Sequence, residues 1–157
     1  MNVAVAKPPL VRLLLPTDSA RWLHLWQGYV AACVEQGIAA PPDNCTELNW
    51  SRLMAIDEPV TGLIAEVDGE AVGLLHLIFH RSTFHENEVC FLQDLFTVNA
   101  FRGKGIARAL IQQAQIEATA KGARRIYWQT AQTNDAAILL YDKVATRTRT
   151  VNFRIAL

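Results

Sequence analysis

The sequence predicts a mixed α/β fold, in which a mostly antiparallel central sheet carries helices on both faces. Asp68-Gly69 separates two apolar segments of strand composition, which is a strong signal for a β-hairpin. Further along the chain, a strand-like segment, a helix and another strand-like segment follow in the order of a parallel crossover. Apolar residues at helical spacing occur before and after these strands.

The expected elements before the hairpin are a strand at residues 11–15, a helix from about 18 to 36 and a helix from about 46 to 56. Pro16 ends the strand, and Thr17 or Asp18 is of the residue type that caps a helix. Gly37 follows the first helix, as expected for a helix stop.

An apolar stripe runs along the first helix. Trp22, Trp26, Tyr29 and Cys33 recur at i, i+4, i+7 and i+11, so they lie on one helical face. Such a stripe indicates core packing more often than an aromatic ligand cage. A binding cleft rimmed by part of it is the alternative.

The hairpin and the elements after it complete the predicted sheet. The expected elements are strands at 60–67, 71–79 and 88–98, a helix at 105–121, a strand at 125–130, a helix at 134–145 and a strand at 151–156. Gly122 is placed to end the helix at 105–121.

Length and composition are those of one globular domain, spanning residues 1–157. Hydrophobic residues make up 51% and charged residues 19%, which argues against disorder. No apolar run approaches the roughly 20 residues that a membrane helix needs, so we expect no membrane partner. The segment 10–15 is too short and too proline-flanked for a secretion signal, and a cytoplasmic location is expected.

Cysteine and histidine spacing predicts no metal site. The three cysteines form no C-x-x-C motif, so neither a disulfide framework nor a zinc site is indicated. The four histidines are scattered, although His76 and His80 fall on one face of an expected strand.

Charge is unevenly distributed along the chain, although its net value is zero. Residues 1–98 hold 5 basic and 12 acidic side chains, a net −7, whereas residues 99–157 hold 10 basic and 3 acidic, a net +7. The split could reflect chance and solvated faces, or a basic half that receives a polyanion and an acidic half that attracts a cation. The neutral total and the absence of an aromatic-basic repeat disfavour nucleic acid as a partner.

A glycine-bearing turn at the start of a helix is the most informative segment for function. Gly103 and Gly105 allow the backbone to approach an anion closely, and the first N–H groups of the helix point outward toward it. Arg102 and Lys104 add positive charge. The segment matches neither a P-loop nor a G-x-G-x-x-G motif, because Arg108 replaces the third glycine.

The spacing Arg102-x-x-Gly105-x-Ala107 resembles the pyrophosphate signature of the GCN5-related N-acetyltransferases, the GNAT superfamily. A second segment, Asn134-x-x-Ala137-x-x-Leu140-Tyr141, is similar to another cofactor segment of that family. The resemblance extends from about residue 60 to 141. Segments 21–29 and 126–130 look like a yeast subgroup that acetylates histones, polyamines or D-amino acids.

The resemblance implies the GNAT fold, with two splayed central strands, and acetyl-CoA as cosubstrate without a metal. It implies transfer of the acetyl group to a primary amine of a small molecule, or to an exposed lysine or N-terminal amine, in a ternary complex. A catalytically silent acyl-CoA-binding module and a structural subunit without a ligand are the alternatives. Relatives are often homodimers. The implied cofactor-binding residues are Val98, Arg102, Gly103, Lys104, Gly105, Ile106, Ala107, Asn134 and Tyr141.

Two side chains are candidates for proton transfer. Tyr141 is the candidate general acid for the leaving thiolate, because a phenol with a pKa of about 10 matches a thiol in basicity; packing at the helix edge is its alternative role. Asp94 is the candidate contact for the acceptor amine, with Glu86, Glu88 or a water as alternatives. Polyamine-acetylating relatives have a Glu-Asp pair here, whereas this chain has Gln93 before Asp94.

Three further points follow from comparison with the family. The backbone near Val98 is implied as the donor that stabilises the developing oxyanion. Asn134 could serve as a helix N-cap, as a contact to the cofactor, or as both. Similar proteins often begin the last strand with a glycine-aromatic pair, but residues 146–150 contain no glycine.

Overall fold

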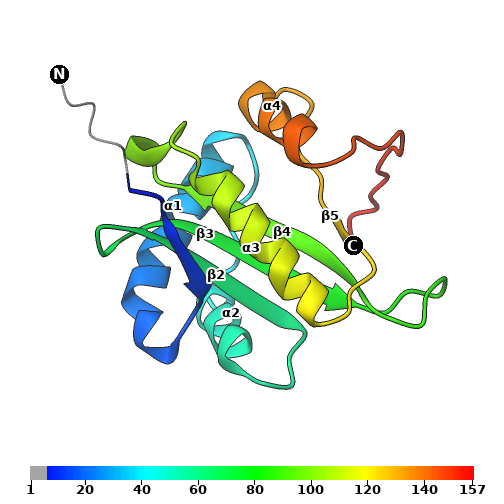
Figure 1. Cartoon of the computed structure of the whole chain (residues 1–157), viewed down its shortest axis with the longest axis horizontal. Helices are drawn as coiled ribbons and strands as arrows, with labels where there is room; N and C mark the ends of the chain where they lie inside the picture. Colours follow the sequence, from blue (N-terminus) through cyan, green and yellow to red (C-terminus); the bar gives the residue numbers. More distant parts are fainter. Residues whose placement is uncertain (1–6) are drawn as a thin grey trace.

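A five-stranded sheet organises the chain in a computed structural model that describes residues 7–157 (Figure 1). The strand order is β1-β2-β3-β4-β5, so each strand lies beside its neighbour in sequence. Strands β1 to β4 pair antiparallel, and β5 joins β4 in parallel. The mixed, mostly antiparallel sheet expected from the sequence is therefore confirmed.

The described elements are β1 (Leu10–Leu13), the 3₁₀ helix η1 (Pro16–Asp18), α1 (Ser19–Glu35), α2 (Cys45–Met54), β2 (Val60–Val67), β3 (Glu70–His80), β4 (Val89–Thr97), the 3₁₀ helix η2 (Asn99–Phe101), α3 (Ile106–Ala120), β5 (Ile126–Tyr127) and α4 (Asp135–Val144). Most bounds agree with the sequence prediction to within one or two residues. The hairpin turn has positive φ at both Asp68 and Gly69, the conformation that this dipeptide favours.

Helices cover both faces of the sheet because neighbouring apolar residues of each strand point to opposite sides. Helices α1 and α2 pack on one face, where Trp22 and Leu53 join a core with Ile64 and Leu74. Helix α3 crosses the other face (Figure 1), where its buried residues share a core with Leu63, Leu75 and Leu77. Two separate cores thus fix the sheet between the helices.

Close contact between α1 and β4 depends on a glycine. A Cβ atom at Gly28 would lie 2.9 Å from Cζ of Phe96, which is closer than real Cβ atoms approach a neighbour. Glycine therefore lets the second half of α1 pack directly on β4. This contact brings the aromatic residues of α1 to the strand that holds Asp94.

The predicted cap of the first helix was wrong in its detail. Asp18 occupies the N-cap position of α1, but its side chain makes no capping hydrogen bond. Instead its carboxylate accepts hydrogen bonds from the guanidinium of Arg12 and from the N–H of Leu15. Arg21 and Glu66 complete a network of ion pairs that joins β1, α1 and β2.

The end of the chain also differs from the prediction. The strand expected at 125–130 is limited to Ile126–Tyr127, and the strand expected at 151–156 is absent from the described residues, which have neither helix nor strand after Val144. Val151, Phe153 and Ile155 alternate as in a strand, but all three are exposed. No described strand pairs with this segment, so its apolar alternation is not matched by a partner.

Candidate active site

The two last strands of the sheet separate after a short contact, as the resemblance predicted. Strand β5 pairs with β4 only at Cys90↔Ile126 and Phe91↔Tyr127. Strand β4 continues to Thr97, and β3 is its only partner over that stretch among the described strands. The edge of β4 that faces β5 therefore carries unpaired backbone groups. We call this opening, between residues 92–97 of β4 and the chain after β5, the β4–β5 gap.

Strand β4 presents different side chains to the two faces of the sheet at this gap. Phe96 packs with the core of α1 and α2, and Asp94 bonds a histidine on that same face. Leu95 packs with the core of α3 instead. The gap therefore lies between an acidic group on the α1 face and the start of α3 on the opposite face.

The backbone donors at the gap lie near Val98, the position that the resemblance implied, although the N–H of Val98 itself is not one of them. The N–H of Val98 donates to the carbonyl of Val72 at 2.9 Å, so it is already engaged with β3. In an antiparallel pair, successive residues point their N–H groups alternately toward and away from the partner strand. The N–H groups that point to the gap are then those of Leu95 and Thr97. The candidate oxyanion donors near Val98 are thus the N–H groups of Leu95 and Thr97, and contacts of Val98 with a cofactor stay a prediction.

The glycine turn at the start of α3 has the geometry of an anion site. Gly103 and Gly105 have φ of 73° and 83°, and Gly105 is the N-cap of the helix. The first helical hydrogen bond at this end joins the N–H of Ala109 to the carbonyl of Gly105. The N–H groups of Ile106 and Ala107 precede that bond, so they are free to bind an anion.

Side chains around this turn divide into buried and exposed. Ile106 is 2% exposed and belongs to the core, so only its backbone can contact a cofactor. Arg102 is exposed, and its Nε donates to the carbonyl of Thr97 at 3.3 Å. Lys104 lies over the ring of Phe101, with Nζ 5.0 Å from the centroid. Both cations are close to the turn, in the place where a pyrophosphate would need them.

A buried hydrogen-bonded chain holds Asp94. Nδ1 of His76 lies 2.9 Å from Oδ2 of Asp94, and the indole N–H of Trp22 donates to Nε2 of His76 at 3.0 Å. An indole N–H can only donate, so Nε2 accepts and Nδ1 carries the proton that His76 donates to the carboxylate. All three side chains are at least nine-tenths buried. Asp94 is thereby fixed with one oxygen occupied.

Tyr29 lies beside this chain. Burial, together with the nearby Asp94 carboxylate and the Cys33 thiol, raises the pKa of the Tyr29 phenol above its usual range. Its ring packs edge-on against Phe96 of β4, with centroids 6.4 Å apart. The phenol therefore stays protonated near Asp94.

The second cofactor segment lies on α4. The Oδ1 atom of Asn134 caps this helix by accepting from the N–H of Ala137 at 3.4 Å, and its Nδ2 donates to Thr130. The ring of Tyr141 packs edge-on against Trp128, 5.4 Å between centroids, and burial raises the pKa of Tyr141. Both alternative structural roles, cap and packing, are therefore present, and either residue could also contact a cofactor.

Several residues of this site were not identified from the sequence as functional. His76 was noted only for its place on a strand face, and Trp22 and Tyr29 were noted as members of an apolar stripe, part of which could rim a binding cleft. Their link to Asp94 depends on the register of β3 and β4, which shifts at a bulge between His76 and Leu77. Because a one-residue shift reverses the face of a side chain, the sequence alone gave no means to pair them.

Among residues 7–157, no three His, Cys, Asp or Glu side chains come together as a metal site. Over the same residues, no helix has both the length and the apolar character to cross a bilayer.

Comparison with known proteins identifies the family. The model of the acetyltransferase (GNAT) family matches residues 17–145. The chain is 31% identical to D-amino-acid N-acetyltransferase HPA3 of Saccharomyces cerevisiae over 147 residues, which cover 92% of this chain and 89% of the yeast protein. It is 28% identical to an aminoglycoside N(6')-acetyltransferase type 1 of Klebsiella aerogenes, over 82% of this chain and 83% of that protein.

Solved structures of similar fold include AAC(6')-Iy in complex with the bisubstrate analogue CoA-S-monomethyl-acetylneamine. The TM-score is 0.80 at 21% identity, covering 96% of this chain and 99% of the other. A ribosomal-protein-alanine N-acetyltransferase from Brucella melitensis gives a TM-score of 0.77 at 19% identity, covering 96% of this chain and all of the other.

The chain belongs to the acetyltransferase (GNAT) family. It is an acetyl-CoA-dependent N-acetyltransferase.

Proposed function

We propose that this enzyme transfers the acetyl group of acetyl-CoA directly to a primary amine, of a small molecule or of an exposed lysine or N-terminus, in a ternary complex. The observation that carries the proposal is the β4–β5 gap, which lies between the anion-binding turn of α3 and the buried Asp94. The two substrates can then approach the gap from opposite faces of the sheet. Direct transfer requires no covalent enzyme intermediate.

The residues at the gap fit acetyl-CoA, which supplies an activated acetyl group when bound. The hydroxyl oxygen of Thr97 is buried without a hydrogen-bond partner in the protein, at the end of β4 where polar groups of the cofactor arm would lie. Nothing lies within 4 Å of the Cβ position of Gly103 or Gly105, so the turn is open to a ligand. Arg102, Lys104 and the N–H groups of residues 106 and 107 would hold the pyrophosphate.

Asp94, held by His76 and Trp22, would remove the proton of the attacking amine. An amine with a pKa of about 10 is almost wholly protonated at neutral pH, so it needs an acceptor before its lone pair can react. One oxygen of Asp94 is held by His76, and the ammonium would approach the carboxylate beside the Tyr29 phenol. As the N–C bond forms, the N–H groups of Leu95 and Thr97 stabilise the carbonyl oxygen.

Departure of the sulfur then needs a proton, and Tyr141 would supply it as the C–S bond breaks. The nitrogen that has bonded the acetyl carbon would lose its second proton through water to the Tyr141 phenolate, so that only the proton on Asp94 is left for release to solvent. The phenol is protonated at neutral pH at its ordinary pKa, and burial raises that pKa, so Tyr141 would keep its proton until the developing thiolate takes it. The Tyr141 ring is held by Trp128 at the edge of the α3 core, on the cofactor side of the gap.

The names of the relatives support an amine acceptor and leave its identity open. The yeast relative is named for D-amino acids and the bacterial relative for aminoglycosides, and both classes carry primary amines. The homodimer and the cytoplasmic location remain predictions.

The test is initial-rate kinetics with acetyl-CoA and an amine panel, following release of free CoA thiol. Double-reciprocal lines that intersect when both substrates are varied are expected for a ternary complex. Parallel lines would indicate a covalent acetyl-enzyme instead. Calorimetric CoA binding without turnover of any amine would favour the alternative, a catalytically silent acyl-CoA-binding module.

A further inference from the structure

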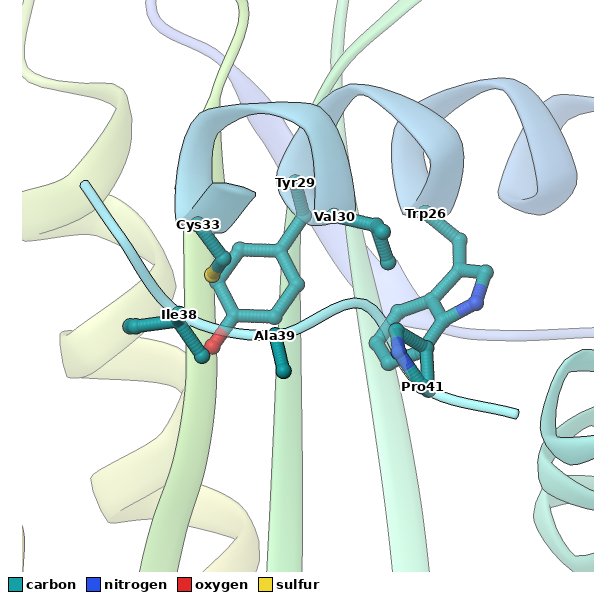
Figure 2. Close-up of a pocket in the computed structure, with 7 residues that line it drawn as sticks. All are labelled: Trp26, Tyr29, Val30, Cys33, Ile38, Ala39 and Pro41. Carbon is teal, nitrogen blue, oxygen red and sulfur yellow. The ribbon is translucent and has the colours of Figure 1, made fainter. Parts of the chain in front are cut away.

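An apolar pocket lies on the α1 face, near the hydrogen-bonded side chains of Trp22, His76 and Asp94. Its volume is about 180 Å³, and Figure 2 shows Trp26, Tyr29 and Val30 extending from α1 toward the loop that carries Ile38, Ala39 and Pro41. An apolar cavity of about 150 Å³ is enough to hold benzene in another protein, so this pocket can accept one six-membered ring.

The lining of the pocket has a definite chemistry. Four of its seven side chains are aliphatic, two are the aromatic rings of Trp26 and Tyr29, and the seventh is the thiol of Cys33. The indole N–H and the phenol hydroxyl are the polar atoms of the two rings. None of the seven is charged. A carboxylate placed there would lose part of its hydration without gaining a cation from the lining, and a second ammonium would gain no carboxylate.

The pocket is joined to Asp94 through two of its lining residues. The ring of Tyr29 packs against Phe96, two residues from Asp94 on the same face of β4, and the Asp94 carboxylate contributes to the raised pKa of the Tyr29 phenol. The ring of Trp26 lies 5.7 Å from that of His76, the residue that holds Asp94. Trp26 and Tyr29 therefore lie between the pocket and the side chains of His76 and Asp94.

We propose that this pocket binds the body of the acceptor, and that the preferred acceptor is a primary amine with one aromatic or compact aliphatic ring and no carboxylate. The apolar ring fills the pocket, and the ammonium lies toward Asp94. This inference rests on the proposed function, because it names the substrate class of the same site. It sets the enzyme apart from its yeast relative, which is named for amino acids that carry a carboxylate.

Matched substrates test the proposal directly. Phenylalanine amide carries a neutral carboxamide where phenylalanine carries a carboxylate, and the two are otherwise identical. Both enantiomers of each compound are compared. We expect kcat/KM for an amide to exceed that of the matching acid by at least about tenfold, since an unpaired buried charge costs more than 1.4 kcal/mol. 2-Phenylethylamine controls for the effect of the amide on amine basicity, and it should also be a good substrate.

A pair of variants on α1 tests the location. Val30→Phe fills the pocket, whereas Val34→Phe places the same ring one turn further along, at an exposed residue outside the lining. We expect Val30→Phe to raise KM for 2-phenylethylamine by about tenfold or more while CoA affinity and turnover of ethylamine persist. Val34→Phe should match the parent enzyme in KM for 2-phenylethylamine, in CoA affinity and in turnover of ethylamine.

The outcomes separate the two proposals. Acids used as well as their amides, spermidine preferred over ring amines, or equal effects of the two variants would overturn the pocket assignment while leaving acetyl transfer intact. CoA binding without acetylation of any amine in the panel would overturn the proposed function, and the pocket assignment with it.

Discussion

The two faces of β4 use opposite means to position chemistry. On the α1 face, Asp94 is buried and held by His76, which is held in turn by Trp22. On the α3 side, Gly103 and Gly105 are exposed, and the groups available to a ligand are backbone N–H groups. The first arrangement depends on packed side chains, and the second depends on local backbone conformation.

This difference suits the task that we propose for each face. A carboxylate that accepts a proton must have a defined orientation, and a low-dielectric surrounding strengthens each of its hydrogen bonds. A pyrophosphate is a large polyanion, which open backbone donors and mobile cations can surround. Substitutions on the α1 face should therefore alter turnover, whereas substitutions at the glycine turn should alter affinity for CoA.

Tyr141→Phe should have the largest effect on turnover. It would be an exception to the contrast between the two faces, because Tyr141 lies on the cofactor side yet is proposed to transfer a proton. The variant keeps the ring against Trp128 and removes the hydroxyl, so CoA affinity and thermal midpoint should persist. General acid catalysis typically contributes about 10² to 10⁴ in rate, and kcat should fall by that order. A lowered melting temperature with nearly normal kcat would identify Tyr141 as a packing residue.

Asp94→Asn should lower kcat by about 10², at the low end of the range for general base catalysis, because water can still remove the proton slowly. The amide keeps the shape and an acceptor for His76, so folding should be retained. Calorimetry with CoA is the control, and its dissociation constant should not change. Parent-like kinetics with the best amine would remove Asp94 from the site.

Gly105→Val should act on affinity alone. A β-branched residue at φ of 83° is strained by about 1 to 3 kcal/mol, and relief of that strain would displace the first N–H groups of α3. If that free energy appears in binding, the dissociation constant for CoA should rise about 5- to 150-fold.

Gly122→Val is the matched control for this variant. Gly122 has φ of 74° and follows the far end of α3, so the same strain is introduced on the same helix away from the turn. We expect similar destabilisation and no change in CoA affinity. Equal CoA affinities in the two folded variants would contradict the assignment of the turn as the pyrophosphate site.

Local sequence patterns predicted the α3 side of the site better than the α1 side. The turn at Gly103 and Gly105 is a property of neighbouring residues, so its positive φ angles and helix start could be predicted directly. The hydrogen bond between His76 and Asp94 joins residues 18 apart across a bulged strand pair, and only the folded register brings them together. The mispredicted strand at 151–156 has the same origin, because alternation of apolar residues specifies no partner.

The smallest expected effect on catalysis comes from Asp18, which belongs to the scaffold of the α1 face. Hydrogen bonds from Arg12 lower the pKa of the Asp18 carboxyl to about 2, from an ordinary value of 3.8. A lowered folded-state pKa means that ionised Asp18 stabilises the fold fully above about pH 4, and that this contribution is lost as the pH falls toward 2. Acid unfolding of the parent enzyme should reflect that loss.

Asp18→Asn removes the titrating group while keeping its size. The variant should be less stable than the parent at pH 7 by about 1.5 to 3 kcal/mol, the usual contribution of hydrogen bonds to a charged group, with unchanged kcat. The difference in the free energy of unfolding, measured by urea titration at a series of pH values, should shrink between pH 4 and 2. A difference that stays constant over that interval would show that the network stabilises the fold by packing rather than by charge. Loss of turnover in the folded variant would instead mean that β1 and the start of α1 help to position Trp22, and that the scaffold and the acidic chain act as one unit.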